Sequence, residues 1–473
     1  MSNKVETLTR RKLLVAASSI PVVAALAACG TATVQPEMAG EKPAEQKAEA
    51  APQPAEPVDV VFVPNPAFRF HEEGHVSNGL MEAFSAEFAN INLLVEPYTG
   101  NRNEAFAAAA AGNIPYDVVT GGEGTPIDRG LQGTVLHLND YIKATALDMD
   151  DVWEGLMEPV IWRDGRVFGM PYGPDMRVLY MNIDLYLNGG LDPAVGPQTW
   201  DEFEEAIQKT TQKDAAGKLT VAGFPPDWGS NGTWLFMLPL LQLGGSRTND
   251  DRTKMTFNTP EGIEAFTFVK RLWDLQDGFA AIKEFQESAR PSGRDRGAAL
   301  VNAKCASIYM TYAERKQQIR PIDPDYEFGY TGFPLPANAA RQVSLGGAWI
   351  HMVSGWTEVA EESFALLEFL ARPENTLAFT KTFDRVPVRK SATLSEEFHE
   401  NDPFVLHMSE NMQYRTSTLG FGVPGSDQMR IEVLTGGWVG SIWNGEVGIQ
   451  EALATAEEQM NIIAEDWRKE LGL

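Results

Sequence analysis

Apolar residues recur in two patterns from residue 58 onward. Short continuous apolar runs, which are typical of buried strands, alternate with longer segments whose apolar residues lie three and four positions apart, as on one face of a helix. The strand-like runs of the first part are 58–63, 92–96 and 116–120, and the helical segments between them are 77–88 and 105–111. Strands and helices that alternate in this way predict an α/β fold with a parallel sheet.

A second series of such elements begins at 178–181 and continues past Phe328. With 473 residues, the chain is long enough for two domains of ordinary size. No short repeat period is visible, which argues against a solenoid. The pattern therefore predicts two α/β regions.

The first 57 residues differ from the rest. An apolar run from 13 to 28 follows the basic residues Arg10 and Arg11. The run is shorter than the roughly 20 residues of a membrane span, so it predicts a signal peptide over residues 1–29. It closes with Leu26-Ala27-Ala28-Cys29, which resembles the lipobox of bacterial lipoproteins and predicts lipidation of Cys29. The arginine pair resembles a twin-arginine export signal, and an ordinary Sec signal is the alternative.

The segment 30–57 is rich in Ala, Glu, Pro, Gln and Lys and contains no aromatic residue. Such a segment buries too little apolar surface to offset the entropy lost on ordering, so it predicts a disordered tether. Signal, lipid and tether together predict an exported protein that is lipid-anchored to the outer face of the cytoplasmic membrane. The other of the two cysteines, Cys305, lies in an apolar stretch, which predicts a buried thiol and excludes a disulfide framework.

Charge narrows the range of partners. The formal net charge is −26. A nucleic-acid-binding protein needs a face of Lys and Arg to meet the phosphate backbone, and peripheral binding to anionic lipid needs basic patches. The composition therefore argues against both partners.

Several segments then match the motifs of a known family. They are 110–119 with Pro115-Tyr116-Asp117-Val118-Val119, 165–172 with Gly169-Met170-Pro171, 179–185 with Tyr180-Met181-Asn182, 198–203 with Thr199-Trp200-Asp201-Glu202, 344–349, and 385–389. These segments resemble the extracellular solute-binding proteins of ABC importers, in the carbohydrate-binding, maltose-binding-protein-like family. The resemblance covers the chain from residue 58 to the C-terminus. Met181 and Ile183 stand where the family usually has Tyr and Lys.

The resemblance implies a two-lobed, type II periplasmic-binding-protein-like α/β fold with three hinge crossovers. The crossovers are expected near 173–177, 332–336 and 386–390. The N-terminal lobe would be 58–174 and 337–385, and the C-terminal lobe 175–336 and 386–473. The implied function is to bind a sugar or oligosaccharide in the cleft by hinge closure and deliver it to the permease subunits of an ABC transporter. It implies a monomer without catalytic residues, cofactor or metal.

The loops that follow the strands are the candidate ligand site, because parallel strands present a crevice at their carboxyl ends. A sugar offers apolar ring faces that aromatic side chains cover, and hydroxyls that carboxylates, Arg and Asn bind. The candidates for the ring faces are Trp228, Tyr312, Trp349 and Phe421. The candidates for the hydroxyls are Glu123, Asp175, Arg177, Asn231, Glu314 and Asp427. Three further candidates for ligand contact are Arg69, His71 and Tyr172.

Each of these aromatic residues has an alternative interpretation as core between the lobes. Trp200, Trp273 and Trp467 lie in helical patterns and are predicted to be packing residues. The stretch from His71 to His75 fits the zinc-protease pattern H-E-x-x-H, which requires a helix. Gly74 weakens a helix, and a helix cap is expected only afterwards, at Ser77 or Asn78, so the stretch is predicted to be a loop.

Two alternatives for the function remain open. A secreted glycoside hydrolase needs two carboxylates about 5 to 9 Å apart on a sugar cleft, and acidic residues are plentiful here. An importer receptor for another solute, such as a glycerol phosphate, a polyamine or a peptide, shares the same fold. The glycine-rich loop 121–124 suits a phosphate, although Glu123 argues against one.

Overall fold

The computed structural model describes residues 57–226, 232–289, 296–383, 385–417, 420–434 and 439–473. The expected signal peptide, Cys29 and the tether up to residue 56 lie outside these residues. The part of the chain from Ala55 to Leu473 forms one compact unit. Within the described ranges, every helix is too short or too polar to cross a bilayer.

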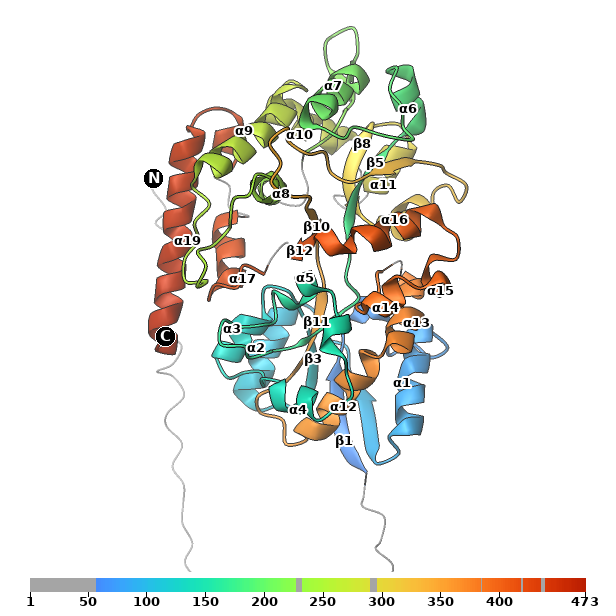
Figure 1. The fold of residues 1–473 in the computed structure, drawn as a ribbon, viewed down its shortest axis with the longest axis vertical. Helices are drawn as coiled ribbons and strands as arrows, with labels where there is room; N and C mark the ends of the chain where they lie inside the picture. The colour runs from blue at the N-terminus through green and yellow to red at the C-terminus, as the bar shows by residue number, and fades with distance from the viewer. Residues whose placement is uncertain (1–56, 227–231, 290–295, 384, 418–419, 435–438) are drawn as a thin grey trace, which may run out of the picture. The chain divides into compact units, whose positions relative to one another are not determined.

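The first three strand-like runs form part of a five-stranded sheet with the order β2-β1-β3-β11-β4 (Figure 1). Its strands are β1 (Val58–Val63), β2 (Ile91–Val95), β3 (Val118–Gly122), β4 (Met170–Tyr172) and β11 (Trp349–Val353). β1 pairs in parallel with β2 and β3, which confirms the predicted parallel sheet. β11 comes from far along the chain and is antiparallel to both of its neighbours.

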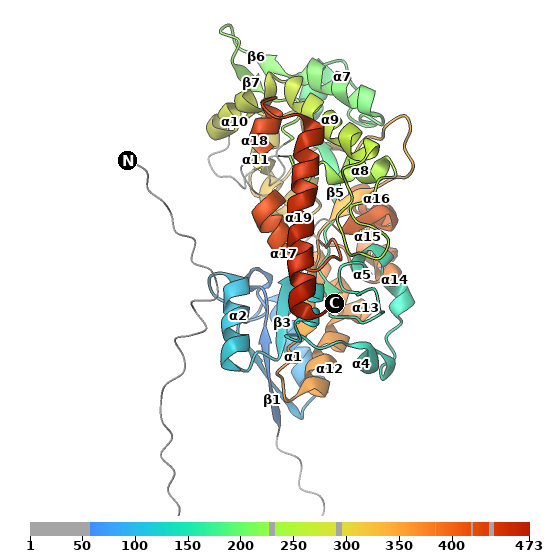
Figure 2. The same ribbon diagram turned by 90° about the vertical axis from the view of Figure 1, so that its left-hand side faces the viewer.

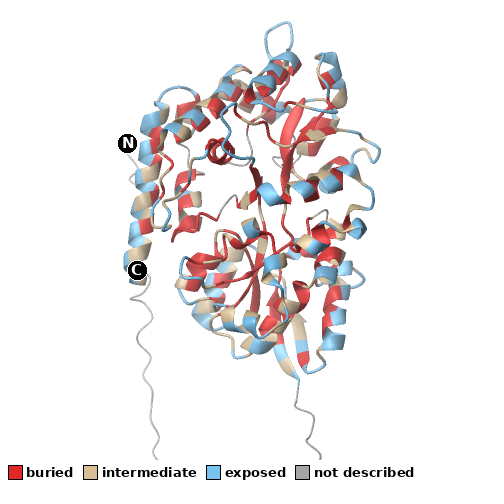
Figure 3. Cartoon of the chain, viewed as in Figure 1, coloured by how far each residue is buried: buried red, intermediate tan, exposed pale blue. Residues whose placement is uncertain are grey.

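Helices cover this sheet and bury their apolar sides against it. They are η2 (Pro66–Phe68), α1 (Val76–Glu87), α2 (Arg102–Gly112), α3 (Pro126–Leu131), α4 (Asn139–Lys143), η3 (Met149–Asp151), α5 (Glu154–Met157), α12 (Ala360–Leu370) and α13 (Pro373–Phe383). Figure 3 shows buried residues along the strands and on the inward sides of these helices. In α1 the buried residues include Leu80, Met81 and Phe84, spaced as the periodicity predicted.

The segment that fits the zinc-protease pattern is not helical. Helix α1 begins at Val76, and His75 caps it by accepting a hydrogen bond from the backbone N–H of Ser77 on Nδ1 at 3.1 Å. Gly74 has φ +77°, a left-handed conformation that suits glycine. The prediction that this stretch is a loop is therefore confirmed, while the cap falls at His75 and not at Ser77 or Asn78.

The second series of elements forms a three-stranded sheet with the order β8-β5-β9. Its strands are β5 (Arg177–Met181), β8 (Ser307–Thr311) and β9 (Gly329–Thr331), and β5 is antiparallel to both neighbours. Beside it, β6 (Gln212–Lys213) and β7 (Leu219–Val221) form a short hairpin, and Ala222 bridges Cys305 in parallel. Cys305 is 1% exposed, as its apolar surroundings predicted.

The helices of this second region pack around a large apolar core. They are α6 (Ile183–Asn188), α7 (Trp200–Thr210), α8 (Met237–Gln242), α9 (Pro260–Asp274), α10 (Gly278–Ala289), α11 (Arg296–Val301), η4 (Arg315–Ile319), α15 (Glu396–His399), α16 (Pro403–Asn411), η5 (Met412–Tyr414), α17 (Ser426–Met429), η6 (Arg430–Leu434), α18 (Val439–Trp443) and α19 (Ile449–Leu471). Helix α14 (Lys390–Thr393) instead packs against α13 of the first region. The long helix α19 contacts α9 (Figure 2).

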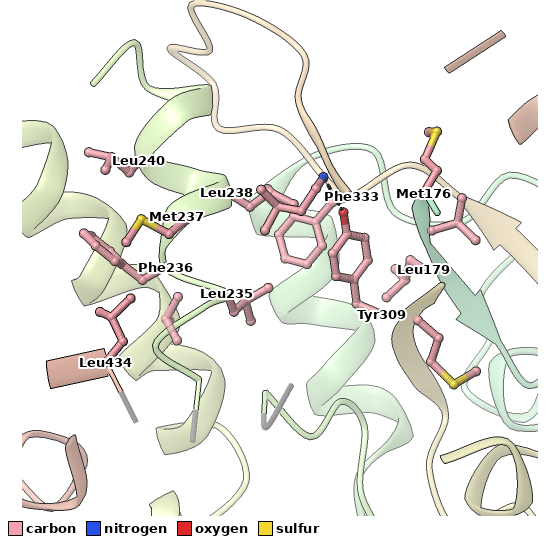
Figure 4. Close-up of a cluster of buried hydrophobic side chains, with 14 of the residues drawn as sticks. Met176, Leu179, Leu235, Phe236, Met237, Leu238, Leu240, Tyr309, Phe333 and Leu434 are labelled. Atoms are coloured by element: carbon pink, nitrogen blue, oxygen red, sulfur yellow. Dashed lines mark hydrogen bonds between the residues drawn. The ribbon is translucent and has the colours of Figure 1, made fainter. Parts of the chain in front are cut away.

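Aromatic side chains fill this core. Trp200 stacks on Phe268 at 3.8 Å between ring centroids, and Trp273 is fully buried, so both are the packing residues that were predicted. Tyr309 and Phe333 face each other beside α8, with 5.1 Å between their ring centroids (Figure 4). Their contact joins strand β8 to the segment that follows β9.

The chain passes between the two sheets three times. The first passage lies between Tyr172 and Arg177, where it was expected. The second comes later than 332–336, because Leu335 still bridges Thr199 of the second region, and the chain enters the first sheet only at Trp349. Before that point, β10 (Ser344–Gly346) pairs with β12 (Arg415–Ser417).

The third passage begins after α13 and ends later than the expected 386–390, because the Trp153 indole of the first lobe still donates to the Thr393 hydroxyl at 3.0 Å. The backbone N–H of Val386 donates to the carbonyl of Pro174 at 3.1 Å, so the first and third passages touch. The chain then runs through α14 and α15 to α16, where Phe404 packs against Tyr180 of β5. The fold is thus two α/β lobes connected by three crossovers, as predicted.

Candidate functional site

The carboxyl end of β3 gathers three of the predicted ligand residues at one edge of the first sheet. Trp349 pairs with Gly122 on one side and with Tyr172 on the other, and Glu123 follows Gly122 directly. Trp349 is partly exposed, whereas Tyr172 and Glu123 are each 2% exposed. Trp349 is therefore the most exposed of the three, and its ring packs edge-on against Phe68 with 5.6 Å between the ring centroids.

The corresponding edge of the second sheet carries three more of the candidates. Arg177 at the start of β5 pairs with Thr311 at the end of β8, and Tyr312 and Glu314 follow. Tyr312 is 3% exposed and packs against Phe404. Glu314 accepts a hydrogen bond from the Thr311 hydroxyl, and burial raises the pKa of its carboxyl.

The Asp175 carboxylate connects all three crossovers. Its Oδ1 accepts from the backbone N–H of Gly347 at 2.7 Å, and its Oδ2 lies 3.1 Å from Nη1 of Arg385. A Cβ on the neighbouring Gly346 would lie 2.3 Å from the Asp175 carbonyl, so this approach requires glycine. Burial alone would raise the pKa of Asp175, but the guanidinium groups of Arg177 and Arg385 and the Gly347 N–H lower it overall.

Glu123 forms a buried ion pair with Arg415 of β12. Their side chains are 1% and 0% exposed, and the Ser417 hydroxyl donates a second hydrogen bond to Glu123 at 2.7 Å. Burial raises the pKa of Glu123, and the Arg415 guanidinium and the Ser417 hydroxyl act in the opposite direction. Arg415 also donates to the Gly155 carbonyl at 2.7 Å, so the pair joins β12 to the first lobe.

Asp427 and Phe421 lie on the segment that follows β12. Asp427 pairs with Arg430 at 2.8 Å and accepts from the Asn103 side chain of α2 at 3.0 Å. Phe421 is 3% exposed, with the guanidinium of Arg247 5.9 Å from its ring centroid. Both residues therefore contact other protein groups.

Arg69 and His71 lie on the outer side of the loop that follows β1. Arg69 pairs with Glu72 at 2.5 Å with half of its side chain exposed, and His71 is exposed. The alternate residues Phe68 and Phe70 point inward and contact Tyr172. No group of three or more His, Cys, Asp or Glu side chains in the described ranges could hold a metal ion.

The remaining two candidates, Trp228 and Asn231, lie outside the described residues. They follow β7, whose neighbour Ala222 bridges Cys305 directly before β8. Their role in ligand contact stays a prediction.

Sequence reasoning did not single out two arginines beside the same sheet edge. Arg102 is the first residue of α2, and its guanidinium lies 5.1 Å from the Trp349 ring centroid. Arg129 of α3 lies 3.7 Å from the Phe106 ring centroid. The rule that selects loops after strands also covers the loop after β2, which leads directly into Arg102, so that signal was present.

A groove of about 680 Å³ lies elsewhere, between α5, the segment 246–252 and β12. Arg247 crosses it to pair with Glu158 at 2.7 Å, and Arg252 donates to the carbonyls of Glu158 and Ile161. Tyr414 is the aromatic residue of its lining. These contacts join the two lobes.

Comparisons of sequence and of structure with known proteins both identify solute-binding proteins. Residues 79–404 match the family of bacterial extracellular solute-binding proteins. The sn-glycerol-3-phosphate-binding periplasmic protein UgpB of Escherichia coli strain K12 is 24% identical over 429 residues, which cover 84% of this chain and 91% of that protein.

Two solved structures show the same fold. One is an ABC substrate-binding protein from Listeria monocytogenes in complex with cycloalternan, with a TM-score of 0.68, 17% identity and coverage of 86% of this chain and 98% of that chain. The other is UgpB from Mycobacterium tuberculosis in complex with glycerophosphocholine, with a TM-score of 0.66, 19% identity and coverage of 87% and 99%.

Proposed function

This chain belongs to the family of bacterial extracellular solute-binding proteins, and we propose from this premise that it captures a sugar or oligosaccharide for an ABC importer. The ligand is bound in the cleft between the lobes and passes unchanged to the permease subunits. Similar structures that hold a cyclic oligosaccharide support this choice of ligand. The protein acts as a monomer, without a cofactor.

The observation that carries the proposal is the position of Trp349. Its partly exposed ring lies at the carboxyl end of β3, where open α/β sheets bind their ligands. The ring is flanked by Tyr172 in the neighbouring strand and by the Arg102 guanidinium. An aromatic face beside hydrogen-bonding groups is what a sugar ring requires.

The three crossovers form the hinge of the proposed mechanism. The first lobe comprises 58–174 and the segment from Trp349 through α14, which packs against α13, and the second comprises 175–346 and the segment from α16 onward. The contacts of Asp175 with Gly347 and Arg385 hold the three passages together while the lobes rotate. Ligand stabilises the closed form because it touches both lobes only there.

Binding without catalysis is supported by the state of the buried carboxylates. A glycosidase needs two carboxyl groups free to act on the glycosidic bond. Glu123 is held by Arg415 and Ser417, and Asp175 is held by Gly347 and Arg385. Both carboxylates therefore have structural partners.

The first prediction is that purified protein binds one member of a panel of mono- and oligosaccharides. Binding should change the tryptophan fluorescence, and at about 100 times the dissociation constant it should add roughly 2.7 kcal/mol to the free energy of unfolding. Trp349→Ala should weaken binding. Trp356→Ala is the matched control, because Trp356 is also partly exposed but follows the opposite end of β11.

Two results would contradict this function. One is binding of a peptide or polyamine with no response to any carbohydrate or polyol. The other is steady turnover of nitrophenyl glycosides that disappears in the Glu123→Gln variant.

We also propose that the chain is anchored to the outer face of the cytoplasmic membrane by lipid on Cys29. Cys29 closes a run of small residues, and the other cysteine, Cys305, is buried in the core. Radioactive palmitate should label the wild-type protein and leave Cys29→Ser unlabelled and in the soluble fraction. Equal labelling of Cys29→Ser would contradict the anchor.

A further inference from the structure

Two arginine side chains lie against the backbone of the glycine pair at the end of β3. A Cβ on Gly122 would lie 3.4 Å from Nη2 of Arg102, and a Cβ on Gly121 would lie 3.6 Å from Nη1 of Arg129. Both guanidinium groups line one small pocket together with Phe106. Arg102 also borders the Trp349 ring, where the sugar is proposed to bind. Arg129 lies further inside the first lobe.

Neither arginine has a carboxylate partner in the described part of the chain. Nη2 of Arg129 donates to the side-chain oxygen of Asn103 at 3.2 Å, whereas Nη1 is buried without a hydrogen bond. Arg102 contacts the Tyr98 hydroxyl, and its Nε is buried without a partner. Arg129 is 7% exposed, so little of its guanidinium reaches bulk solvent.

The nearest carboxylates are already engaged. Asp427 uses one oxygen for Arg430 and the other for Asn103. Asp128 accepts the backbone N–H of Gly425 at 2.8 Å, and burial raises its pKa to about 7. Burial likewise lowers the pKa of Arg129 to about 9, with the neighbouring Arg102 acting in the same direction and Asp427 and Asp128 acting against it. Positive charge is therefore in excess here, although the whole chain carries −26.

We propose that Arg102, with Arg129 behind it, binds an anionic group of the ligand, either a carboxylate or a phosphate. The ligand is then an acidic sugar or a phosphorylated polyol. The inference rests on the proposed function and specifies its ligand. Glu123 does not repel such a group, because Arg415 already neutralises it. Guanidinium groups bind carboxylate and phosphate through paired hydrogen bonds, and a site that excludes water strengthens them.

The test measures binding to the full-length protein in detergent by calorimetry. The probes are glucose, glucuronate and glucose 6-phosphate, glycerol and glycerol 3-phosphate, and neutral and uronic trisaccharides. At least one anionic probe should bind about tenfold or more tightly than its neutral counterpart, with an affinity that falls as salt is added. Whether the uronates or the phosphates respond distinguishes the two anionic groups.

Arg102→Gln should abolish the preference for the anionic probe, and Arg102→Lys should retain part of it. Arg166→Gln is the matched control, since Arg166 pairs with Asp164 on the surface, and it should leave binding unchanged. The melting temperature of ligand-free Arg102→Gln should stay the same or rise, because a partly buried guanidinium without a salt bridge to the described residues is removed. If Arg102 served only to stabilise the fold, Arg102→Gln would lower the melting temperature.

The outcomes separate this inference from the proposed function. If a neutral sugar binds as tightly as its anionic counterparts and Arg102→Gln retains that affinity, the anionic subsite is refuted and the sugar-binding function stands. If no hydroxylated probe binds but a polyamine or a peptide does, both fail.

Discussion

Replacing Arg415 with Met should lower the free energy of unfolding by about 3–5 kcal/mol at neutral pH. The Arg415 and Glu123 side chains are 0% and 1% exposed, so water cannot solvate the carboxylate that remains. Loss of the guanidinium also removes a hydrogen bond to the Gly155 carbonyl. Urea unfolding followed by circular dichroism gives the measurement.

The double variant Glu123→Gln with Arg415→Met is the informative control. It removes both charges, so it should recover a large part of the stability that the single variant loses. Arg166→Met, which disrupts a surface pair with Asp164, should change the stability by no more than about 1 kcal/mol. If Arg415→Met lowered the free energy of unfolding by less than about 1 kcal/mol, the buried ion pair would not stabilise the contact between the lobes as its geometry indicates.

The second large effect is the dependence of stability on pH through His351. The imidazole is 1% exposed in β11, with Nδ1 3.0 Å from the Thr120 hydroxyl and with Phe62 and Tyr172 against its ring. Burial lowers the pKa of His351 to about 3, whereas in the unfolded chain it is about 6.5. The folded protein therefore holds a neutral histidine throughout the mildly acidic range.

The direction in which stability changes with pH follows from proton uptake by the unfolded chain. Below about pH 6.5 the unfolded chain binds a proton at this site and the folded chain does not, so stability is full at neutral pH and falls with the pH until about pH 3. The contribution approaches about 1.4 kcal/mol per pH unit below the unfolded pKa, which amounts to roughly 2 kcal/mol between pH 6.5 and 4.5.

Comparison of variants isolates this contribution from that of the carboxylates. His351→Phe should remove this histidine's share of the slope of unfolding free energy against pH, about 1.4 kcal/mol per pH unit. Substitution of the exposed His137 by Gln should leave the slope unchanged. NMR of the folded protein should show no titration of the His351 ring between pH 7.5 and 4.5. A ring that titrates near pH 6.5 would contradict the buried neutral state.

The elements of the fold could be predicted from the sequence where a local pattern specifies them. Val58–Val63 forms the strand that its apolar run indicated, and Thr199 and Glu202 form a capping box at the start of α7. Trp200, Trp273 and Cys305 are packed or buried as their neighbours along the chain suggested. These properties depend on residues within a few positions of one another.

The edge of the candidate site could also be predicted, but the roles of its charged residues could not. Glu123 follows β3, as the rule for loops after strands predicted, and Trp349 lies at the same sheet edge although it begins strand β11. The positions of the loops did not indicate that Glu123 would pair with Arg415, 292 positions away. Nor did they indicate that Asp175 would bind the Gly347 N–H and the Arg385 guanidinium. The loop before Arg102 carried the same signal, because it too follows a strand of the sheet, but Arg102 was not among the predicted residues.

By itself, the sequence determined the alternation of strands and helices, the two-lobed family fold and the residue types at the strand ends, because periodicity and short motifs encode burial and turns locally. Only the tertiary structure decided which charges neutralise one another. Partners such as Arg415 and Glu123 meet when the lobes pack, and that packing brings together side chains that are hundreds of residues apart along the chain.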